Sequence, residues 1–268
     1  MPFDVTAFEA ALKTRRLGRR LLFAETMAST NQTLLDAAKA GTAVPGTVAL
    51  CERQTAGRGR QRRLWHSPPG LNLYFSVLWE SRQTAARMPQ LAMVAALALR
   101  RALAEIAPEA AIGLKWPNDL WDGAGRKLSG ILCECPPWRD DTRQAVVGIG
   151  VNVNAAQEDF PPELATTAGS LRLATGRIFA REALLAVLLG HLETLLEAWE
   201  ASTDFASFTD EWAAHDILKG RVIAVETPGG GLMRGRVLGV DGMGLLRLQG
   251  DDGAVTTITA GDVHLRVG

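Results

Sequence analysis

The chain has 268 residues, 47% of them hydrophobic and 22% charged, and its 29 basic and 29 acidic side chains give a formal net charge of zero. This composition is typical of a globular protein with one large domain, alone or with a small appendage. Zero net charge argues against a nucleic-acid partner. The lack of a long apolar run or a signal-peptide pattern argues against a membrane partner. We therefore expect a cytoplasmic protein.

The hydrophobic pattern predicts an α+β fold for most of the chain. Strands are expected over residues 20–25, 47–51, 73–79, 114–116, 127–135 and 145–154. Helices are expected over residues 8–12, 31–41, 89–107, 181–199 and 205–215. Ser29 or Thr30 can cap the second of these helices and Gly41 can end it. One face of the third strand carries alternating large apolar side chains, namely Leu73, Phe75, Val77 and Trp79.

The character of the sequence changes near Asp216. Residues 216–268 are short β-type runs separated by glycine-rich turns, which predicts a small all-β domain beside a larger domain over residues 1–215. A unit of this size buries little core alone, so we expect it to dock on the larger domain. The three cysteines, Cys51, Cys133 and Cys135, lack metal-site spacing, and the last two are interpreted as buried free thiols.

The stretch Gly57–Trp65, GRGRQRRLW, is the most unusual part of the chain. Its four arginines are Arg58, Arg60, Arg62 and Arg63. Like charges repel and ordering long side chains costs rotamer entropy, so an idle loop of this composition is unfavourable. Arginine binds phosphate bidentately and glycine lets the backbone approach it closely, so the loop predicts a compact anionic ligand.

Four further motifs accompany the loop: ETMASTNQTLL (25–35), LKWPNDLW (114–121), RKLSGILCE (126–134) and VVGIGVNVN (146–154). Together with the loop they closely resemble the biotin–protein ligases, from about Phe23 to the C-terminus. The related lipoate ligases share the fold, but their loop lacks the arginine-rich GRGR form. A lipoate or octanoate ligase or transferase is the nearer alternative. A non-catalytic biotin-binding or regulatory protein is the more distant one, and it would be expected to lack Lys127 or Asp119.

The resemblance implies a class II synthetase-like mixed β-sheet catalytic domain with packed helices, and an SH3-like C-terminal domain. It implies that biotin is adenylated by ATP, with Mg²⁺, and is then passed from biotinyl-5′-AMP to a lysine of a biotin carboxyl carrier protein. No tightly bound cofactor is expected. Only 22 residues precede Phe23, so we expect no N-terminal DNA-binding domain. Family members occur as monomers and dimers, which leaves a homodimer open.

The same resemblance assigns the charged chemistry. By resemblance, Lys127 is expected to contact both the biotin carboxylate and the α-phosphate, and Arg60 is expected to hold the adenylate. Arg58 lies beside Arg60 at the carboxylate and phosphates. Gly57 and Gly59 let the loop open before biotin binds and close afterwards. Such closure protects a mixed anhydride from water.

The loop departs from the family pattern GRGRRGR at two positions. Here Gln61 stands at the fifth position and Arg62 replaces the glycine at the sixth. This change removes a flexible point and adds a charge, which puts the details of loop closure in question. Neither Arg62 nor Arg63 is assigned a catalytic role.

The KWPND motif predicts a loop at a strand end, because Pro117 has no N–H to donate and breaks the strand. This arrangement should expose Asn118 and Asp119. By resemblance Asp119 either orients Mg²⁺ on the triphosphate or accepts a proton from the carrier lysine, and the sequence does not choose between these roles. Asn118 and Lys115 are expected at the nucleotide.

The remaining site residues also follow from the resemblance. The ureido head of biotin is expected to bind Ser29, Thr30, Asn31 and Gln54, together with backbone around Gly130. Helix capping by Ser29 or Thr30 is compatible with this role. Trp65 should cover the adenylate and Asn152 should lie near ATP. GIGVNV and GRGRQR lack the third glycine of a dinucleotide-binding motif, and the sequence has no Walker A motif.

Overall fold

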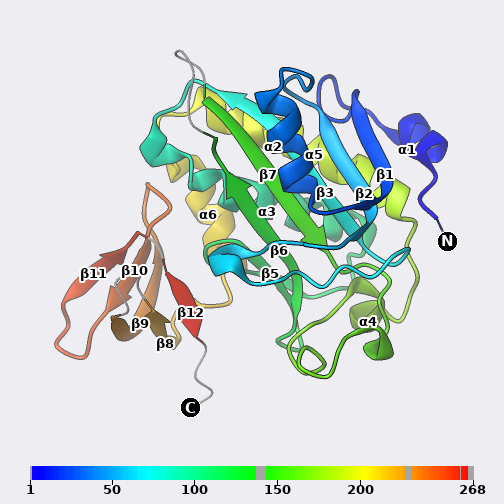
Figure 1. The fold of residues 1–268 in the computed structure, drawn as a ribbon. Coiled ribbons are helices and arrows are strands. Elements are labelled where there is room, and N and C mark those ends of the chain that lie inside the picture. The colour runs from blue at the N-terminus through cyan, green and yellow to red at the C-terminus, as the bar shows by residue number, and fades with distance from the viewer. Residues whose placement is uncertain (1, 137–142, 227–230, 260, 265–268) are drawn as a thin grey trace.

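The computed structural model describes residues 2–136, 143–226, 231–259 and 261–264. Its centre is a seven-stranded mixed sheet with the order β1-β2-β3-β7-β6-β5-β4 (Figure 1). The pair β1 and β2 is parallel, whereas the other neighbouring pairs are antiparallel. The strands are β1 (Leu21–Met27), β2 (Val48–Gln54), β3 (Leu73–Ser81), β4 (Ile112–Lys115), β5 (Asp119–Asp122), β6 (Lys127–Glu134) and β7 (Arg143–Val151).

Helices cover both faces of this sheet (Figure 1). They are α1 (Val5–Ala11), α2 (Thr30–Lys39), α3 (Gln90–Ile106), α4 (Leu171–Thr175), α5 (Arg181–Ala201) and α6 (Ala206–His215). Short 3₁₀ turns occur at Arg60–Arg62, Ala85–Arg87 and Gln157–Asp159. Among the described residues, no helix is long and apolar enough to cross a membrane.

Alternate residues of the central strands contact different helix layers. Val77 and Val147 belong to the large core that contains α3 and α5, whereas Leu78 and Val146 pack against Leu34 of α2 on the opposite face. The predicted apolar face of β3 is confirmed, since all four of its side chains lie in the large core. Burial on both faces explains why α3 is so apolar and why β3 reads as a nearly continuous apolar run.

Local signals set the start of α2 as expected. The Ser29 hydroxyl accepts from the Gln32 N–H, so Ser29 is the N-cap and Thr30 is the first helical residue. The helix ends at Lys39, and Gly41 follows with a positive φ of 71°. The first helix begins earlier than predicted, at Val5, because the Asp4 carboxylate caps it by accepting from the Ala7 N–H.

The C-terminal part is a five-stranded antiparallel sheet with the order β11-β10-β9-β8-β12. Its strands are β8 (Val222–Glu226), β9 (Leu232–Val240), β10 (Leu246–Gln249), β11 (Val255–Ile258) and β12 (Asp262–His264). The expected docking on the larger part is confirmed, because the Trp116 indole N–H donates to the Gly244 carbonyl at 3.0 Å. Gly244 has a positive φ of 76° and packs against Phe205 and Met93. The boundary between residues 215 and 216 stays a prediction.

The structure differs from the sequence-based expectations at β5 and at the cysteines. Residues 119–122 form β5, a short strand between β4 and β6 that the proline before it concealed. The thiols also differ from their interpretation: Cys51 is the buried one, while Cys133 is partly buried and Cys135 is exposed. Cys135 directly follows Glu134, the last residue of β6.

Candidate active site

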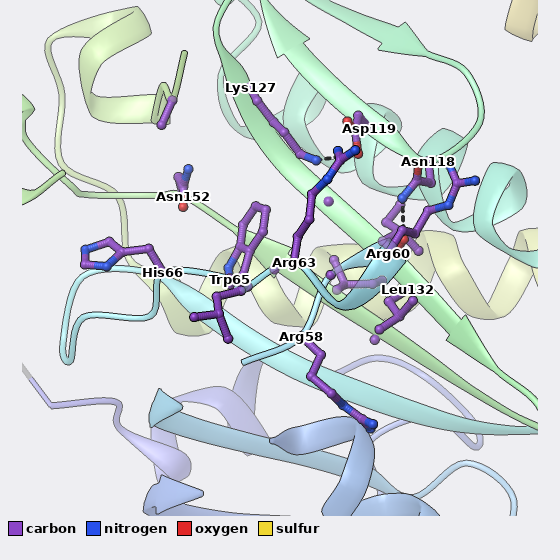
Figure 2. Close-up of a pocket in the computed structure, with 18 of the residues that line it drawn as sticks. Arg58, Arg60, Arg63, Trp65, His66, Asn118, Asp119, Lys127, Leu132 and Asn152 are labelled. Atoms are coloured by element: carbon purple, nitrogen blue, oxygen red, sulfur yellow. Dashed lines mark hydrogen bonds and ion pairs between the residues drawn. The ribbon is translucent and has the colours of Figure 1, made fainter. Parts of the chain in front are cut away.

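A cavity of about 250 Å³ lies between the arginine loop, the first turn of α2 and the face of β6 and β7 that α2 covers (Figure 2). The cavity brings together nearly all the site residues predicted from the sequence. Those that line it are Ser29, Thr30, Asn31, Gln54, Arg58, Gly59, Arg60, Trp65, Asn118, Asp119, Lys127, Gly130 and Asn152. Gly57 and Lys115 are not part of its wall.

The floor of the cavity exists because glycines replace side chains on one face of two strands. Gly130 of β6 pairs with Gly150 of β7, and Gly148 lies two residues before Gly150 on the same face. A Cβ on Gly148 would lie 1.9 Å from Asn31 Oδ1, and one on Gly150 would lie 2.5 Å from the Trp65 indole. The alternation in GIGVNVN therefore provides room for two side chains that line the site.

The arginine loop folds back on itself. The Trp65 N–H donates to the Gly57 carbonyl at 3.0 Å, and the Gly59 N–H donates to the Arg63 carbonyl at 2.7 Å. A Cβ on Gly57 would lie 2.7 Å from the Trp65 carbonyl oxygen, so the two arms approach too closely for a larger residue. Gln61 occupies the turn with a φ of 52°, a left-handed conformation that is strained for glutamine.

The indole of Trp65 lies against the glycine floor inside this loop. A Cβ on Gly130 would lie 3.0 Å from the Trp65 ring, and the Lys127 ammonium lies 5.6 Å from the ring centroid. The ring thus separates part of the floor from solvent. It presents an aromatic face beside a cation, which is suited to a planar or apolar ligand group.

Lys127 and Asp119 form a charged pair at one end of the cavity. Lys127 Nζ lies 2.7 Å from Asp119 Oδ1, and the two side chains are 33% and 16% exposed. Lys127 starts β6 and Asp119 starts β5, and the Asp119 backbone pairs with Gly130. In Figure 2 the Arg63 side chain extends from the loop toward this pair. Sequence reasoning gave Arg63 no role, although it lines the cavity.

Arg60 connects the loop to two other parts of the chain. Its Nη1 donates to Asn118 Oδ1 at 3.3 Å and its Nη2 donates to the Gly261 carbonyl at 3.2 Å. Asn118 was expected to be exposed but is only 8% exposed, because its amide also donates to the Ile131 carbonyl at 2.7 Å. The KWPND turn is therefore packed against β6 and not free in solvent.

Polar groups gather around the start of α2. Gln54 Oε1 accepts from the Thr30 N–H at 2.9 Å, and the Gln54 amide donates to the Ser67 hydroxyl at 3.2 Å. Ser29, Thr30 and Asn31 are each 4% exposed. A ligand with several hydrogen-bonding groups fits this end of the cavity, whereas the Lys127 end fits an anion.

Two predicted residues have a structural partner that the sequence did not show. The Asn152 amide donates to the Gly169 carbonyl at 2.9 Å, which joins β7 to the segment before α4. Lys115 Nζ lies 4.4 Å from the Trp121 ring centroid, and Trp121 itself lines the cavity. Lys115 thus contacts a residue of the cavity wall without being part of the wall itself.

Sequence reasoning missed the apolar wall that precedes α4. Phe160, Leu164 and Ala168 line the cavity, and Phe160 and Ala168 are the buried centre of a small cluster of their own. The Lys127 N–H donates to the Thr167 carbonyl at 2.7 Å, which places this wall beside the Lys127–Asp119 pair. The segment has no helical or strand periodicity, so no pattern indicated its position.

Neither a thiolate nor a self-contained metal site is present among the residues that the structure describes. Burial raises the pKa of the Cys51 thiol to about 12, so it is a thiol at neutral pH. No group of three or more His, Cys, Asp or Glu side chains is arranged to hold a metal ion in the described ranges. The polar side chains that line the cavity are those of lysine, arginine, aspartate, histidine, amide and hydroxyl residues.

The comparisons with known proteins agree with this geometry. Residues 23–152 match the Biotin/lipoate A/B protein ligase family, and residues 220–266 match the Biotin protein ligase C terminal domain. The chain is 32% identical to the bifunctional ligase/repressor BirA of Bacillus spizizenii, over 95% of the chain and 76% of the relative. It is 34% identical to the biotin–[acetyl-CoA-carboxylase] ligase of Mycobacterium tuberculosis, over 89% of the chain and 86% of the relative.

Solved structures show the same similarity. The biotin protein ligase from Aquifex aeolicus in complex with biotin and ATP matches 92% of this chain and 99% of its own, with a TM-score of 0.78 and 30% identity. The apo structure of that protein matches with a TM-score of 0.75 and 26% identity. The motifs, the fold and these matches together show that the chain belongs to the biotin/lipoate protein ligase family and, within it, to the biotin protein ligases.

Proposed function

We propose that this chain uses ATP to convert biotin to biotinyl-5′-AMP and then transfers biotin to a lysine of a biotin carboxyl carrier protein. The observation that supports this most directly is the division of one cavity into two ends. The Lys127–Asp119 pair lies at one end, and the buried polar groups at the start of α2 lie at the other. Biotin has the same division, since its head is a urea and its tail ends in a carboxylate.

In the first step, a biotin carboxylate oxygen attacks the α-phosphorus of ATP. A new P–O bond forms, the bond from the α-phosphorus to the bridging oxygen breaks, and pyrophosphate leaves. Two anions must approach each other, so fixed cations between them lower the barrier. Lys127 fits this role because Asp119 holds its ammonium at 2.7 Å within the cavity. Arg60, which belongs to the loop above, is proposed to hold the adenylate and phosphates.

ATP enters such reactions as a complex with Mg²⁺. Asp119 is suited to be the one protein ligand of that ion. Mg²⁺ is commonly bound by one or two carboxylates together with phosphate oxygens and waters, so a cluster of acidic residues is not required. When bound, the ion would neutralise charge on the leaving pyrophosphate. Its contact with Asp119 would compete with the ion pair between Asp119 and Lys127. Asp119 would therefore pair with Lys127 when ATP is absent and with the ion when ATP is bound.

In the second step, the carrier lysine amine attacks the acyl carbonyl, a C–N bond forms and AMP leaves with the C–O electrons. The amine loses a proton, and Asp119 is the carboxylate in the cavity wall placed to accept it. Water must be kept from the mixed anhydride until the carrier arrives. The folded loop and the Trp65 indole are proposed to do this, with Asn118 and Asn152 on the nucleotide side.

The biotin head is proposed to bind at the start of α2. Ser29, Thr30, Asn31 and Gln54 supply donors and acceptors there, and Gly130 leaves its backbone open to the cavity. Gln54 is already oriented by its contacts with Thr30 and Ser67, which lowers the entropy lost on binding. The lipoyl and octanoyl groups have no urea, so they would leave these polar groups unsatisfied.

The test is ATP–pyrophosphate exchange with biotin, lipoate or octanoate and no carrier. Exchange with biotin alone is expected. Exchange with lipoate or octanoate instead would assign the chain the alternative function, and exchange with none of the three would contradict adenylation. A second assay then measures transfer of labelled biotin to a carrier domain, with a carrier whose target lysine is changed to arginine as the control.

A further inference from the structure

Glu134 occupies a position between the arginine loop and the start of α2. Its Oε2 accepts from Arg58 Nη2 at 3.0 Å and from Asn31 Nδ2 at 2.8 Å. Asn31 also donates to the Leu132 carbonyl at 3.1 Å and accepts from the Ser76 hydroxyl at 2.5 Å. One carboxylate oxygen thus joins the loop to a chain of hydrogen bonds that continues under the polar end of the cavity.

The two partners of Glu134 differ in burial. Arg58 and Glu134 have side chains that are 37% and 28% exposed, and ion pairs this exposed to solvent contribute little to the stability of a fold. Asn31 is 4% exposed, and a buried amide depends strongly on each of its partners. The arrangement is therefore better suited to fixing positions than to stabilising the protein as a whole.

The Glu134 contact attaches the loop to β6 through Arg58. Arg58 is flanked by Gly57 and Gly59, so the backbone on both sides of it turns easily. Another attachment is Arg60, which reaches Asn118. Figure 2 shows that the Arg58 side chain points away from Lys127 and Asp119, toward the opposite end of the cavity.

We propose that Glu134 is a positioning residue that holds Arg58 and so shifts the arginine loop toward its closed position over the cavity. The proposal rests on the proposed biotin ligase function, because the same carboxylate orients Asn31 at the biotin head. It assigns the Arg58 side chain to the loop attachment, and leaves the phosphates to Lys127 and Arg60. The position of the arginine loop and the shape of the pocket for the biotin head are then coupled through Glu134 Oε2.

The test uses the full-length Glu134→Gln variant, which keeps the shape of the side chain and removes its charge. In the ligand-free protein, tryptic cleavage at the loop arginines is expected to become about 3- to 10-fold faster. The KM for biotin in pyrophosphate exchange is expected to rise by a similar factor, while kcat changes by less than about twofold. Glu134→Asp, which restores the charge, is expected to recover most of both effects.

The control is Glu25→Gln, which removes a charge from an exposed position on β1. A double-mutant cycle with Arg58→Gln measures the coupling directly, with cleavage scored at the remaining arginines of the loop. The combined variant is expected to be cleaved no faster than either single variant. Unchanged cleavage in Glu134→Gln, or fully additive effects in the cycle, would overturn the proposal. If the wild type shows no exchange with biotin, the proposed function fails, and the cleavage assay still decides whether Glu134 holds the loop.

Discussion

Glu52 of β2 and Arg181 of α5 form a buried ion pair. Arg181 Nη1 lies 2.8 Å from Glu52 Oε2, and the two side chains are 5% and 9% exposed. The same oxygen accepts from the Gly70 N–H at 3.1 Å, and Arg181 also donates to the Asn72 carbonyl at 3.0 Å. The pair therefore fixes the turn through which the chain passes from Trp65 into β3, and with it the returning arm of the arginine loop.

Glu52→Gln is expected to destabilise the protein by about 3 to 5 kcal/mol, because it leaves a buried guanidinium without its counter-charge. Urea unfolding at neutral pH measures this change in the free energy of unfolding. Glu197→Gln is the control, because its partner Arg15 is 75% exposed and such a pair contributes about 0 to 1 kcal/mol. Equal losses in the two variants would contradict the structural role of the buried pair.

The same carboxylate predicts a pH dependence. Burial raises the pKa of Glu52, but Arg181 and the N–H groups of Phe3 and Gly70 outweigh burial and hold the pKa below its ordinary value of 4.5. The contribution to stability is therefore complete above pH 4.5 and is lost as the pH falls through the lower folded-state pKa. The difference in unfolding free energy between wild type and Glu52→Gln should shrink over this acidic range, and a constant difference would argue against it.

Lys127→Ala is expected to lower kcat for biotin-dependent pyrophosphate exchange by about 100- to 1,000-fold, because it removes the fixed cation between two anions. Its folding stability should change little, since the side chain is one-third exposed. Lys219→Ala, at an exposed position outside the cavity, is the control. Near-wild-type rates at saturating biotin and ATP would refute the role proposed for Lys127.

Lys115→Ala tests whether Lys115 contacts the phosphates, as the sequence predicts, or stays outside the cavity, as the structure shows. The family pattern places Lys115 at the phosphates, but in the structure its ammonium lies 4.4 Å from the Trp121 ring centroid and Lys115 does not line the cavity. We expect a loss of less than about tenfold in kcat/KM for ATP, which corresponds to less than one direct charged contact. A loss as large as that of Lys127→Ala would show that Lys115 moves into the cavity when ATP binds.

Arg60→Gly is expected to increase the rate at which biotinyl-5′-AMP leaves the protein by about 10- to 100-fold, because the loop loses both its contact with Asn118 and its contact with Gly261. Escaped adenylate should then label bystander lysines. The measurements are the adenylate release rate and the labelling of an unrelated protein. Arg60→Lys keeps the charge but not the forked geometry, so its adenylate release rate should lie between those of the wild type and Arg60→Gly. An unchanged release rate with labelling confined to the carrier would refute this role.

The sequence predicted the parts of the fold that depend on repeated patterns. Alternation along β3 and β7 and helical spacing in α5 are properties of many residues at once, so single exceptions did not hide them. β5 was missed because it is four residues long and follows Pro117, and its position is fixed by strands on both sides. Local propensity does not carry that information.

The candidate site was predictable to the extent that its residues stand in motifs. Lys127, Asp119 and Gln54 are far apart in sequence yet line one cavity, as the resemblance implies. Glu134 is the last residue of the RKLSGILCE motif, but the sequence assigned it no role, because its two partners come from α2 and from the loop. The left-handed conformation of Gln61 was equally hidden, since nothing in a glutamine indicates a positive φ.

Asp216 lies where the segment leading to the C-terminal sheet leaves α6. Its backbone forms a parallel bridge with Leu114, and its Oδ1 accepts from the Leu218 N–H at 2.8 Å. Its Oδ2 is buried and has no hydrogen-bond donor among the described residues. Burial raises the pKa of Asp216 from 3.8 to about 6. At neutral pH the segment beside the KWPND strand therefore contains a charge that is poorly solvated.

Asp216→Asn is expected to stabilise the protein at pH 7.5 by about 1 to 3 kcal/mol, because a pKa shift of one unit corresponds to about 1.4 kcal/mol. The pKa is higher in the folded state, so the neutral carboxyl favours folding below pH 3.8 and this contribution is lost as the pH rises through about 6. Urea unfolding from pH 4.5 to 7.5 should show a stability gain that grows with pH, whereas Asp210→Asn, at an exposed position on α6, should show none. A gain independent of pH would mean that the carboxylate at this junction is already solvated or paired, and that its charge does not weaken the connection between the two sheets.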